Sequence, residues 1–191
     1  MSDGRTIAGR KKGYTYDLYE TPAWATQTFV DAALRDGVLT PGEFIYDCCS
    51  GAGAIIDVLK ANGFGTTASD IQVAPYIVGD QGVDVYELED DWPYTIMTNP
   101  PYKLMTDGDM LKEFLRIGAG KVILLLNIYF LSSQKRKEML KASPLKYVYV
   151  HSGRVTMYPY GEEKPKNGGT KMYAWFVWER GYEGEPVIRY L

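Results

Sequence analysis

The chain has 191 residues, of which 46% are hydrophobic and 24% are charged, and its formal net charge is −3. This length predicts one domain, and the composition excludes a mainly disordered or fibrous protein. The net charge argues against binding nucleic acid through a global positive field. No apolar run approaches the roughly 20 residues of a membrane span, and the polar start does not resemble a signal peptide. We therefore expect a soluble cytoplasmic protein without membrane contact.

The histidine and cysteine counts exclude two further classes of site. The chain has one histidine, His151, and its only cysteines are the neighbours Cys48 and Cys49. A single histidine excludes a multi-histidine metal site, and two adjacent cysteines exclude a disulfide framework and most zinc sites. We expect no metal, and we interpret the two cysteines as small apolar residues rather than reactive thiols.

The chain begins with a polar, basic, glycine-rich segment, residues 1–13, which we predict to be a flexible arm before a single domain of residues 14–191. The first predicted helix runs through Leu34, with Thr21 as its N-cap and Pro22 as its first residue. Gly37 ends it.

Strand and helix patterns then alternate along the chain. Strands are predicted at residues 44–46, 66–69, 94–98, 121–130, 147–150 and 172–179, and helices at 54–62, 110–117 and 133–141. Such alternation predicts an α/β fold, a mostly parallel sheet with helices on both faces. Because residues 157–170 contain no helical pattern, the last strand is expected to be an antiparallel edge strand.

A glycine loop follows the first of these strands, in the sequence Asp47-Cys-Cys-Ser-Gly51-Ala-Gly53. In an open α/β sheet, ligands bind at the carboxyl ends of the strands. Asp70 ends the next strand, where an acidic side chain accepts hydrogen bonds from ribose hydroxyls. Ile56 stands where a dinucleotide site has its third glycine, and no Walker sequence is present. A nucleoside ligand without a pyrophosphate therefore fits better, although a plain strand-to-helix turn stays open.

The tetrapeptide Asn99-Pro100-Pro101-Tyr102 ends a strand at the same predicted sheet edge. Its two prolines fix the backbone and remove two donors. The Asn99 side-chain oxygen and the Pro100 carbonyl then offer two neutral acceptors beside an aromatic ring. This arrangement suits a planar base with an exocyclic amine.

These residues resemble the S-adenosylmethionine-dependent N6-adenine DNA methyltransferases, closest to small phage-type or orphan enzymes. The likeness extends from about residue 16 to residue 182, and the order of the motifs carries it. It implies a single-domain Rossmann-like methyltransferase fold and S-adenosylmethionine as cofactor. The implied cofactor-binding residues are Tyr19, Thr21, Pro22, Asp47, Cys49, Ser50, Gly51, Gly53, Asp70, Ile71, Asp84, Val85 and Asn99.

The resemblance assigns catalysis to Asn99, Pro100, Pro101 and Tyr102, and substrate binding to Tyr102, Lys103, Arg154, Lys171 and Tyr173. It implies methyl transfer to adenine N6 in DNA, with RNA as a further partner class, on a flipped or single-stranded base. Further basic residues are open to phosphate contact or to an ordinary solvated role: Lys135, Arg136, Lys137, Lys164 and Lys166.

The chain departs from the restriction-modification pattern, because residues 103–120 and 181–191 leave little room for a separate target-recognition domain. We therefore expect short or relaxed sequence specificity. Three alternatives remain: an RNA adenine or protein glutamine methyltransferase with the same motif, a non-catalytic nucleic-acid-binding partner of a methyltransferase, and a nicotinamide oxidoreductase. Ile56 disfavours the last.

Overall fold

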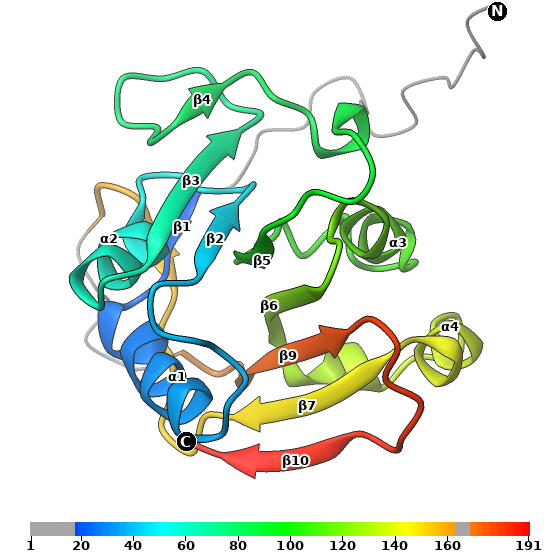
Figure 1. Ribbon diagram of the computed structural model, residues 1–191. Coiled ribbons are helices and arrows are strands. Elements are labelled where there is room, and N and C mark those ends of the chain that lie inside the picture. Colours follow the sequence, from blue (N-terminus) through cyan, green and yellow to red (C-terminus); the bar gives the residue numbers. More distant parts are fainter. Residues whose placement is uncertain (1–17, 163–168) are drawn as a thin grey trace, which may run out of the picture.

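The computed structural model describes residues 18–162 and 169–191, so the predicted arm at residues 1–13 lies outside the described part. Eight strands form the main sheet, in the order β10-β7-β9-β6-β5-β2-β3-β4 (Figure 1). Their bounds are β2 Phe44–Asp47, β3 Gly65–Asp70, β4 Asp80–Gln81, β5 Thr95–Thr98, β6 Lys121–Asn127, β7 Leu145–Val150, β9 Tyr173–Glu179 and β10 Val187–Tyr190.

Helices cover both faces of this sheet, as predicted. Figure 1 shows α1 (Ala23–Arg35) and α2 (Ala54–Ala61) on one side, and α3 (Asp109–Ile117) and α4 (Lys137–Ala142) on the other. Successive side chains of β6 point to opposite faces of the sheet, which explains this layering. Ile123 and Leu125 belong to the core under α1 and α2, whereas Val122, Leu124 and Leu126 belong to the core under α3. No helix among the described residues is long and apolar enough to cross a membrane.

The antiparallel strand is confirmed, but its predicted place at the edge of the sheet is wrong. β9 lies between β6 and β7 and pairs antiparallel with both. The edge beyond β7 is formed by β10, which runs parallel to β7 with Ile188 opposite Val148. All four residues of β10 are exposed, so the strand lacks the alternation of buried and exposed positions that marks a half-buried strand.

Two predicted helix starts and one strand end are also wrong. Pro22, not Thr21, is the N-cap of α1, and the Thr21 side chain makes no capping bond. The strand predicted through residue 130 ends at Asn127, whose side chain accepts a hydrogen bond from the Tyr129 amide and starts the 3-10 turn Ile128–Leu131. The basic helix begins at Lys137 rather than at Ser133.

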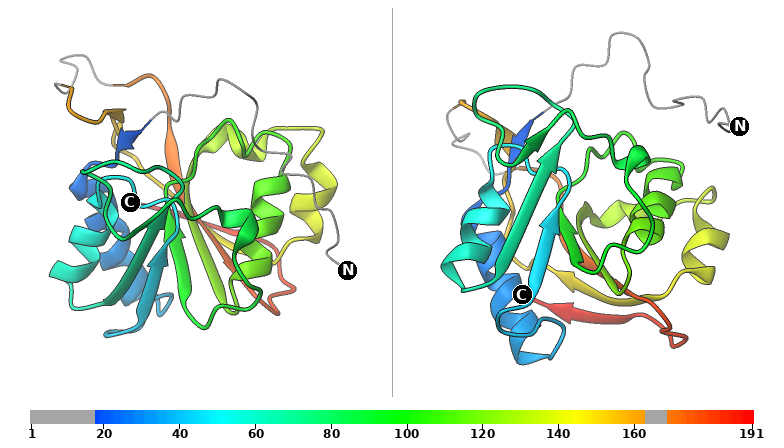
Figure 2. Two further views of the ribbon diagram at one scale, coloured as in Figure 1. Left: turned by 90° about the horizontal axis from the view of Figure 1, so that it is seen from above. Right: turned by 45° about the horizontal axis from the view of Figure 1, so that its top comes forward.

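A second, two-stranded sheet was not predicted. β1 (Tyr19–Glu20) pairs antiparallel with β8 (Tyr158–Pro159), and the Tyr160 amide donates to the Leu18 carbonyl at 3.0 Å. Two-residue strands carry no periodic signal, which is why sequence patterns miss them. Figure 2 shows this ribbon beyond the carboxyl ends of the parallel strands. It therefore forms a wall above the sheet edge where ligands bind in such folds.

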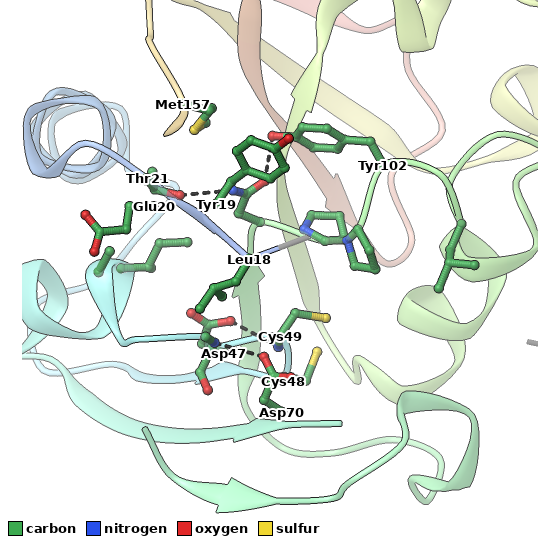
Figure 3. A pocket seen from close by; sticks show the side chains of 18 of the residues that line it. Leu18, Tyr19, Glu20, Thr21, Asp47, Cys48, Cys49, Asp70, Tyr102 and Met157 are labelled. Carbon is green, nitrogen blue, oxygen red and sulfur yellow. Dashed lines mark hydrogen bonds between the residues drawn. The ribbon is translucent and has the colours of Figure 1, made fainter. Parts of the chain in front are cut away.

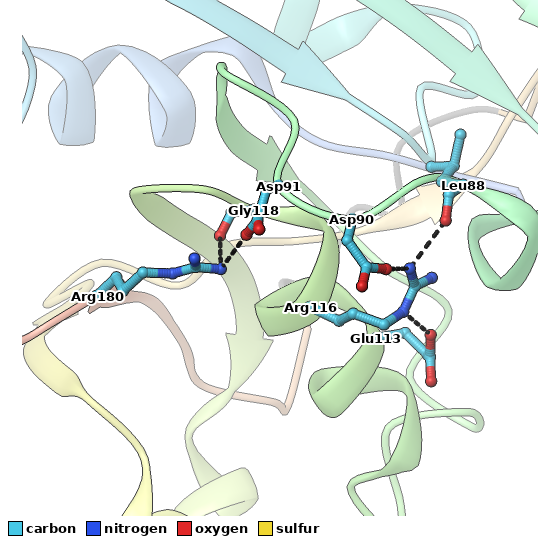
Figure 4. Close-up of polar contacts among 7 residues, drawn as sticks. All are labelled: Leu88, Asp90, Asp91, Glu113, Arg116, Gly118 and Arg180. Atoms are coloured by element: carbon cyan, nitrogen blue, oxygen red, sulfur yellow. Dashed lines mark hydrogen bonds and ion pairs between the residues drawn. The ribbon is translucent and has the colours of Figure 1, made fainter.

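The acidic loop before β5 is neutralised by arginines (Figure 4). The Arg116 guanidinium pairs with Asp90, contacts Glu113 at 2.7 Å and donates to the Leu88 carbonyl. Arg180 pairs with Asp91 at 2.7 Å. This loop leads into the amino end of β5, so the acids lie at the sheet edge opposite the glycine loop.

Candidate active site

A cleft of about 490 Å³ opens at the carboxyl ends of β2, β3 and β5, where the sequence predicted a ligand site (Figure 3). Its walls bring together most of the predicted residues: Tyr19, Thr21, Asp47, Cys49, Ser50, Gly51, Asp70, Ile71, Asp84, Val85, Asn99, Pro100, Pro101, Tyr102, Lys103, Lys171 and Tyr173. Three predicted residues, Pro22, Gly53 and Arg154, lie outside its lining. The volume is in the range of small-molecule sites.

The glycine loop is tied to its neighbours by short hydrogen bonds. The Gly51 amide donates to Asp70 Oδ2 at 2.9 Å, and the Ser50 hydroxyl donates to the Val78 carbonyl at 2.6 Å. Asp70 Oδ1 also accepts from the Gln72 amide at 2.8 Å. Asp70 therefore fixes the loop at the end of β3, and it lines the cleft with acceptor capacity that these two bonds leave unused.

The glycines of this loop are required by the backbone conformation and by the packing around them. Gly51 and Gly53 have φ angles of +51° and +85°, which favour glycine. A Cβ atom on Gly51 would lie 2.5 Å from Leu18 Cδ1, and one on Gly53 would lie 2.8 Å from Val78 Cγ2. Neither position accepts a side chain without displacing a neighbour.

Asp47 presents a buried acceptor to the cleft. Its Oδ1 accepts from the Cys49 amide at 3.2 Å, and the Thr98 hydroxyl contacts the carboxyl group, although Oδ2 makes no hydrogen bond of ordinary geometry among the described residues. Burial raises the pKa of Asp47 to about 7, and burial also raises the pKa of Asp70. A buried carboxylate oxygen without a partner is costly, so Asp47 is suited to a ligand donor or cation at this point.

Cys48 is buried as expected, whereas Cys49 is only partly buried, and both line the cleft. Contact with the neighbouring Cys48 thiol and burial raise the pKa of Cys49 well above its usual range, so its thiol stays neutral. Among residues 18–162 and 169–191, no group of three or more His, Cys, Asp or Glu side chains is placed to hold a metal ion.

The Asn99 amide is held between two hydroxyl groups. Its Nδ2 donates to Thr21 Oγ1 at 3.1 Å, and the Tyr102 hydroxyl donates to its Oδ1 at 2.6 Å. The Tyr102 ring lies 5.8 Å from the ring of Tyr173, and burial raises the pKa of Tyr102 well above its usual range. In Figure 3, Tyr102 faces the cleft from the side opposite Asp47 and Asp70. Neither hydroxyl contact was predicted.

Only some of the basic residues proposed to contact phosphates lie at the cleft. Lys103 and Lys171 are exposed and line the cleft, whereas Arg154 is exposed outside it. A phosphate contact by Arg136 is contradicted: its side chain is buried and donates to the Phe130 carbonyl at 2.9 Å and to the Thr106 carbonyl at 2.5 Å. Lys164 and Lys166 lie outside the described residues.

Several lining residues were not predicted. Cys48, Gln72 and Tyr86 are direct neighbours of predicted residues, so extending each motif by one position finds them. Val155 likewise follows the predicted Arg154, whereas no such signal marks Met157; both reach the cleft from the segment between β7 and β8. The unpredicted lining residues are Leu18, Glu20, Cys48, Ala52, Ala54, Ile55, Gln72, Val83, Tyr86, Leu104, Met110, Val155, Met157, Gly169 and Thr170.

No protein-family model matches the sequence, and a search of curated proteins finds no match. The fold is similar to a protein from Pyrococcus horikoshii provisionally named an RNA methyltransferase, with a TM-score of 0.63 and 12% identity over 88% of this chain and 90% of that one. A methyltransferase subunit of a type I restriction-modification system from Streptococcus thermophilus matches with a TM-score of 0.54 and 11% identity. That match covers 88% of this chain and 46% of the subunit.

A third similar structure, from Listeria monocytogenes, is provisionally named a class I S-adenosylmethionine-dependent methyltransferase. It matches with a TM-score of 0.53 and 11% identity over 95% of this chain and 68% of that one. At these identities the similarity establishes the fold alone. The chain therefore has the Rossmann-like class I methyltransferase fold, as its motifs predicted.

Proposed function

We propose that the protein transfers a methyl group from S-adenosylmethionine to the exocyclic N6 amine of adenine in DNA. The observation that carries this proposal is the Asn99 amide, held by Thr21 and Tyr102 in the same cleft as the buried acids Asp47 and Asp70. The motif resemblance supplies the adenine target. The names of the similar structures, one from a restriction-modification system and one linked to RNA, are consistent with a polynucleotide substrate.

The residues of the cleft fit the proposed cofactor. The buried Asp47 carboxylate suits the ammonium group of its methionine part, and the remaining lone pairs of Asp70 suit the ribose hydroxyls. Asp84 and Val85 line the cleft where the adenine ring is expected. When bound, S-adenosylmethionine supplies the electrophilic sulfonium methyl group.

The Asn99 oxygen and the Pro100 carbonyl perform the proposed activation of the amine. Adenine N6 is a poor nucleophile because its lone pair is delocalised into the ring. Hydrogen bonds from its N–H groups to these two acceptors favour a pyramidal nitrogen with a localised lone pair. The same fixed dipoles stabilise the positive charge that develops on nitrogen as the carbon–nitrogen bond forms and the carbon–sulfur bond breaks. The methylated amine then loses its extra proton to water. The fixed cleft also replaces a bimolecular encounter with a positioned one.

The proposal is tested with labelled S-adenosylmethionine and four separate acceptors: double-stranded DNA, single-stranded DNA, RNA and total protein. We expect label in N6-methyladenine of DNA, identified by mass. Label in RNA adenine or in protein glutamine would replace the proposed substrate by one of the alternatives. Absence of cofactor binding by calorimetry would favour the non-catalytic alternative.

Asn99→Ala should abolish methyl transfer and leave cofactor binding in place, because it removes an acceptor for the amine and keeps Asp47 and Asp70. Asn62→Ala is the matched control, since the Asn62 amide contacts Gln27 on the α1–α2 side of the sheet. Turnover of Asn99→Ala equal to that of the wild type would contradict the catalytic assignment.

A further inference from the structure

Three large apolar side chains are exposed at the edge of the sheet beside the cleft. Tyr129 is 63% exposed, Met172 is 54% exposed and Leu131 is 40% exposed. The Ile128 amide donates to the Met172 carbonyl at 2.9 Å, which joins the turn after β6 to the residue before β9. Figure 2 shows both segments at the edge where the β1–β8 ribbon lies. A protein surface on which large apolar side chains are exposed next to a cleft is typical of a binding site.

Two cationic side chains lie at the mouth of the same cleft. Lys171 precedes Met172 in the chain, and both Lys171 and Lys103 line the cleft. We refer to Lys103, Tyr129, Leu131, Lys171 and Met172 as the rim surface. It combines flat or flexible apolar groups with positive charge, which is the combination that single-stranded polynucleotides require.

The buried Arg136 holds the rim surface in one arrangement. Its guanidinium donates to the carbonyls of Phe130 and Thr106 and lies 4.5 Å from the centre of the Phe130 ring. It therefore connects the loop that follows Tyr102 to the turn that carries Tyr129 and Leu131. A surface fixed in this way loses little conformational freedom when a ligand binds.

We propose that the rim surface binds the nucleotides next to the target base, and this proposal rests on the proposed function. The Tyr129 ring stacks on a neighbouring base, Leu131 and Met172 pack against the same nucleotide, and Lys103 and Lys171 face the phosphates. The target base enters the cleft beside Asn99. The rim surface thereby holds the strand on which the flipped adenine lies, outside the cleft described above.

Binding is measured by fluorescence anisotropy with a labelled single-stranded DNA oligonucleotide containing one adenine. Because the stacking of one base on an aromatic ring is worth roughly 1–3 kcal/mol, Tyr129→Ala should weaken binding about 5- to 150-fold. Tyr129→Phe keeps the ring and should bind within about twofold of the wild type. Tyr190→Ala is the matched control, because Tyr190 is 75% exposed on β10, which β7 and β9 separate from β6.

A second oligonucleotide, with abasic sites on both sides of the adenine, tests the stacking itself. With this probe the difference between Tyr129→Ala and the wild type should disappear. Equal binding of Tyr129→Ala and the wild type to the intact oligonucleotide would overturn the rim-surface proposal and leave the proposed function standing. A wild-type protein that binds S-adenosylmethionine, fails to bind the oligonucleotide and methylates a protein would overturn the proposed substrate and the rim surface together.

Discussion

The Asn99 side chain shows how a single residue is prepared for its proposed role before any substrate arrives. An asparagine amide has a donor end and an acceptor end, and both are bonded here to hydroxyl groups of Thr21 and Tyr102. Either hydroxyl is able to donate or to accept, so the amide plane is held whichever end faces Thr21. The oxygen retains a second lone pair for an incoming amine. The sequence predicted Thr21 as a helix cap and cofactor contact, and the structure adds this link to Asn99.

Thr21→Val should lower kcat by about 10- to 100-fold, because loss of the hydroxyl releases one end of the amide and small misplacements are costly. Thr21→Ser keeps the hydroxyl and should retain most of the rate. Steady-state kinetics with S-adenosylmethionine measure both variants. A Thr21→Val enzyme with an unchanged kcat and a raised KM for the cofactor would limit Thr21 to cofactor binding.

The raised pKa of Asp47 gives a pH dependence whose sign is fixed. An unfolded Asp titrates near 4 and the folded group at about 7, so the folded protein binds the proton more tightly between these values. This residue therefore makes stability fall as pH rises from about 4 to about 7, with no further change above. Without cofactor, the advantage of Asp47→Asn over the wild type in thermal unfolding should grow as pH rises from about 4 to about 7 and stay constant above.

The same titration should govern cofactor binding, because the ionised carboxylate is the proposed partner of the ammonium group. Calorimetry should show the affinity of the wild type for S-adenosylmethionine rising between pH 6 and pH 8. Asp47→Asn should bind weakly with a flat profile over this range. A parallel rise in the variant would assign the pH dependence to another group.

At the scale of elements, the glycine loop joins β2 to α2 through a turn that only glycine fits without strain. Gly53→Ala should lower the free energy of unfolding by more than the roughly 1–2 kcal/mol of a left-handed alanine, because its Cβ also meets Val78. Gly37→Ala is the matched control, since Gly37 has a φ of +69° and no atom within 4 Å of the added Cβ. Urea unfolding measures both variants.

Replacement of Val78 by a smaller side chain gives the complementary test. Gly53→Ala with Val78→Ala should recover the part of the loss that comes from the close contact, whereas the backbone part should remain. If Gly53→Ala and Gly37→Ala cost the same, contact with Val78 does not constrain this position.

The sequence predicted the elements whose signals are local and missed those that depend on distant pairing. The helix predicted at residues 54–62 ends at Ala61, and Gly63 has the left-handed conformation expected after a helix. This helix could be predicted because its periodic apolar residues and the glycine that ends it are close in the chain. β1 and β8 are separated by more than a hundred residues and have two residues each, so nothing local marks them. The cleft residues were predicted where they belong to motifs, and Met157 was missed because only the fold brings it there.

At the scale of the whole molecule, the net charge of −3 hides an uneven distribution. The acids Asp90 and Asp91 are paired with Arg116 and Arg180 at the far edge of the sheet, and Asp47 and Asp70 are buried in the cleft. Lys103 and Lys171 lie exposed at the mouth of that cleft, whose walls also include the partly buried Glu20 and Asp84. A local positive rim is therefore compatible with an acidic protein.

The dependence of DNA binding on salt should be shallow for this reason. With two or three phosphate contacts on a single strand, the logarithm of the association constant should fall against the logarithm of salt with a slope of about −1.4 to −2. Lys171→Gln should reduce the size of this slope by about 0.7, whereas Tyr129→Ala should weaken binding and leave the slope unchanged. Anisotropy titrations at several salt concentrations measure both, and a slope near −6 would indicate a larger positive surface.

The place of β9 in the sheet has a consequence for the order in which the chain folds. β7 has two neighbours in the sheet, β9 and β10, and both follow it in the chain. During synthesis, residues 145–150 therefore have no strand to pair with until residues 173–179 have left the ribosome. β6, already paired with β5, likewise keeps an open edge until then. Open strand edges invite pairing with other chains, so the nascent protein is most prone to aggregation just before β9 inserts.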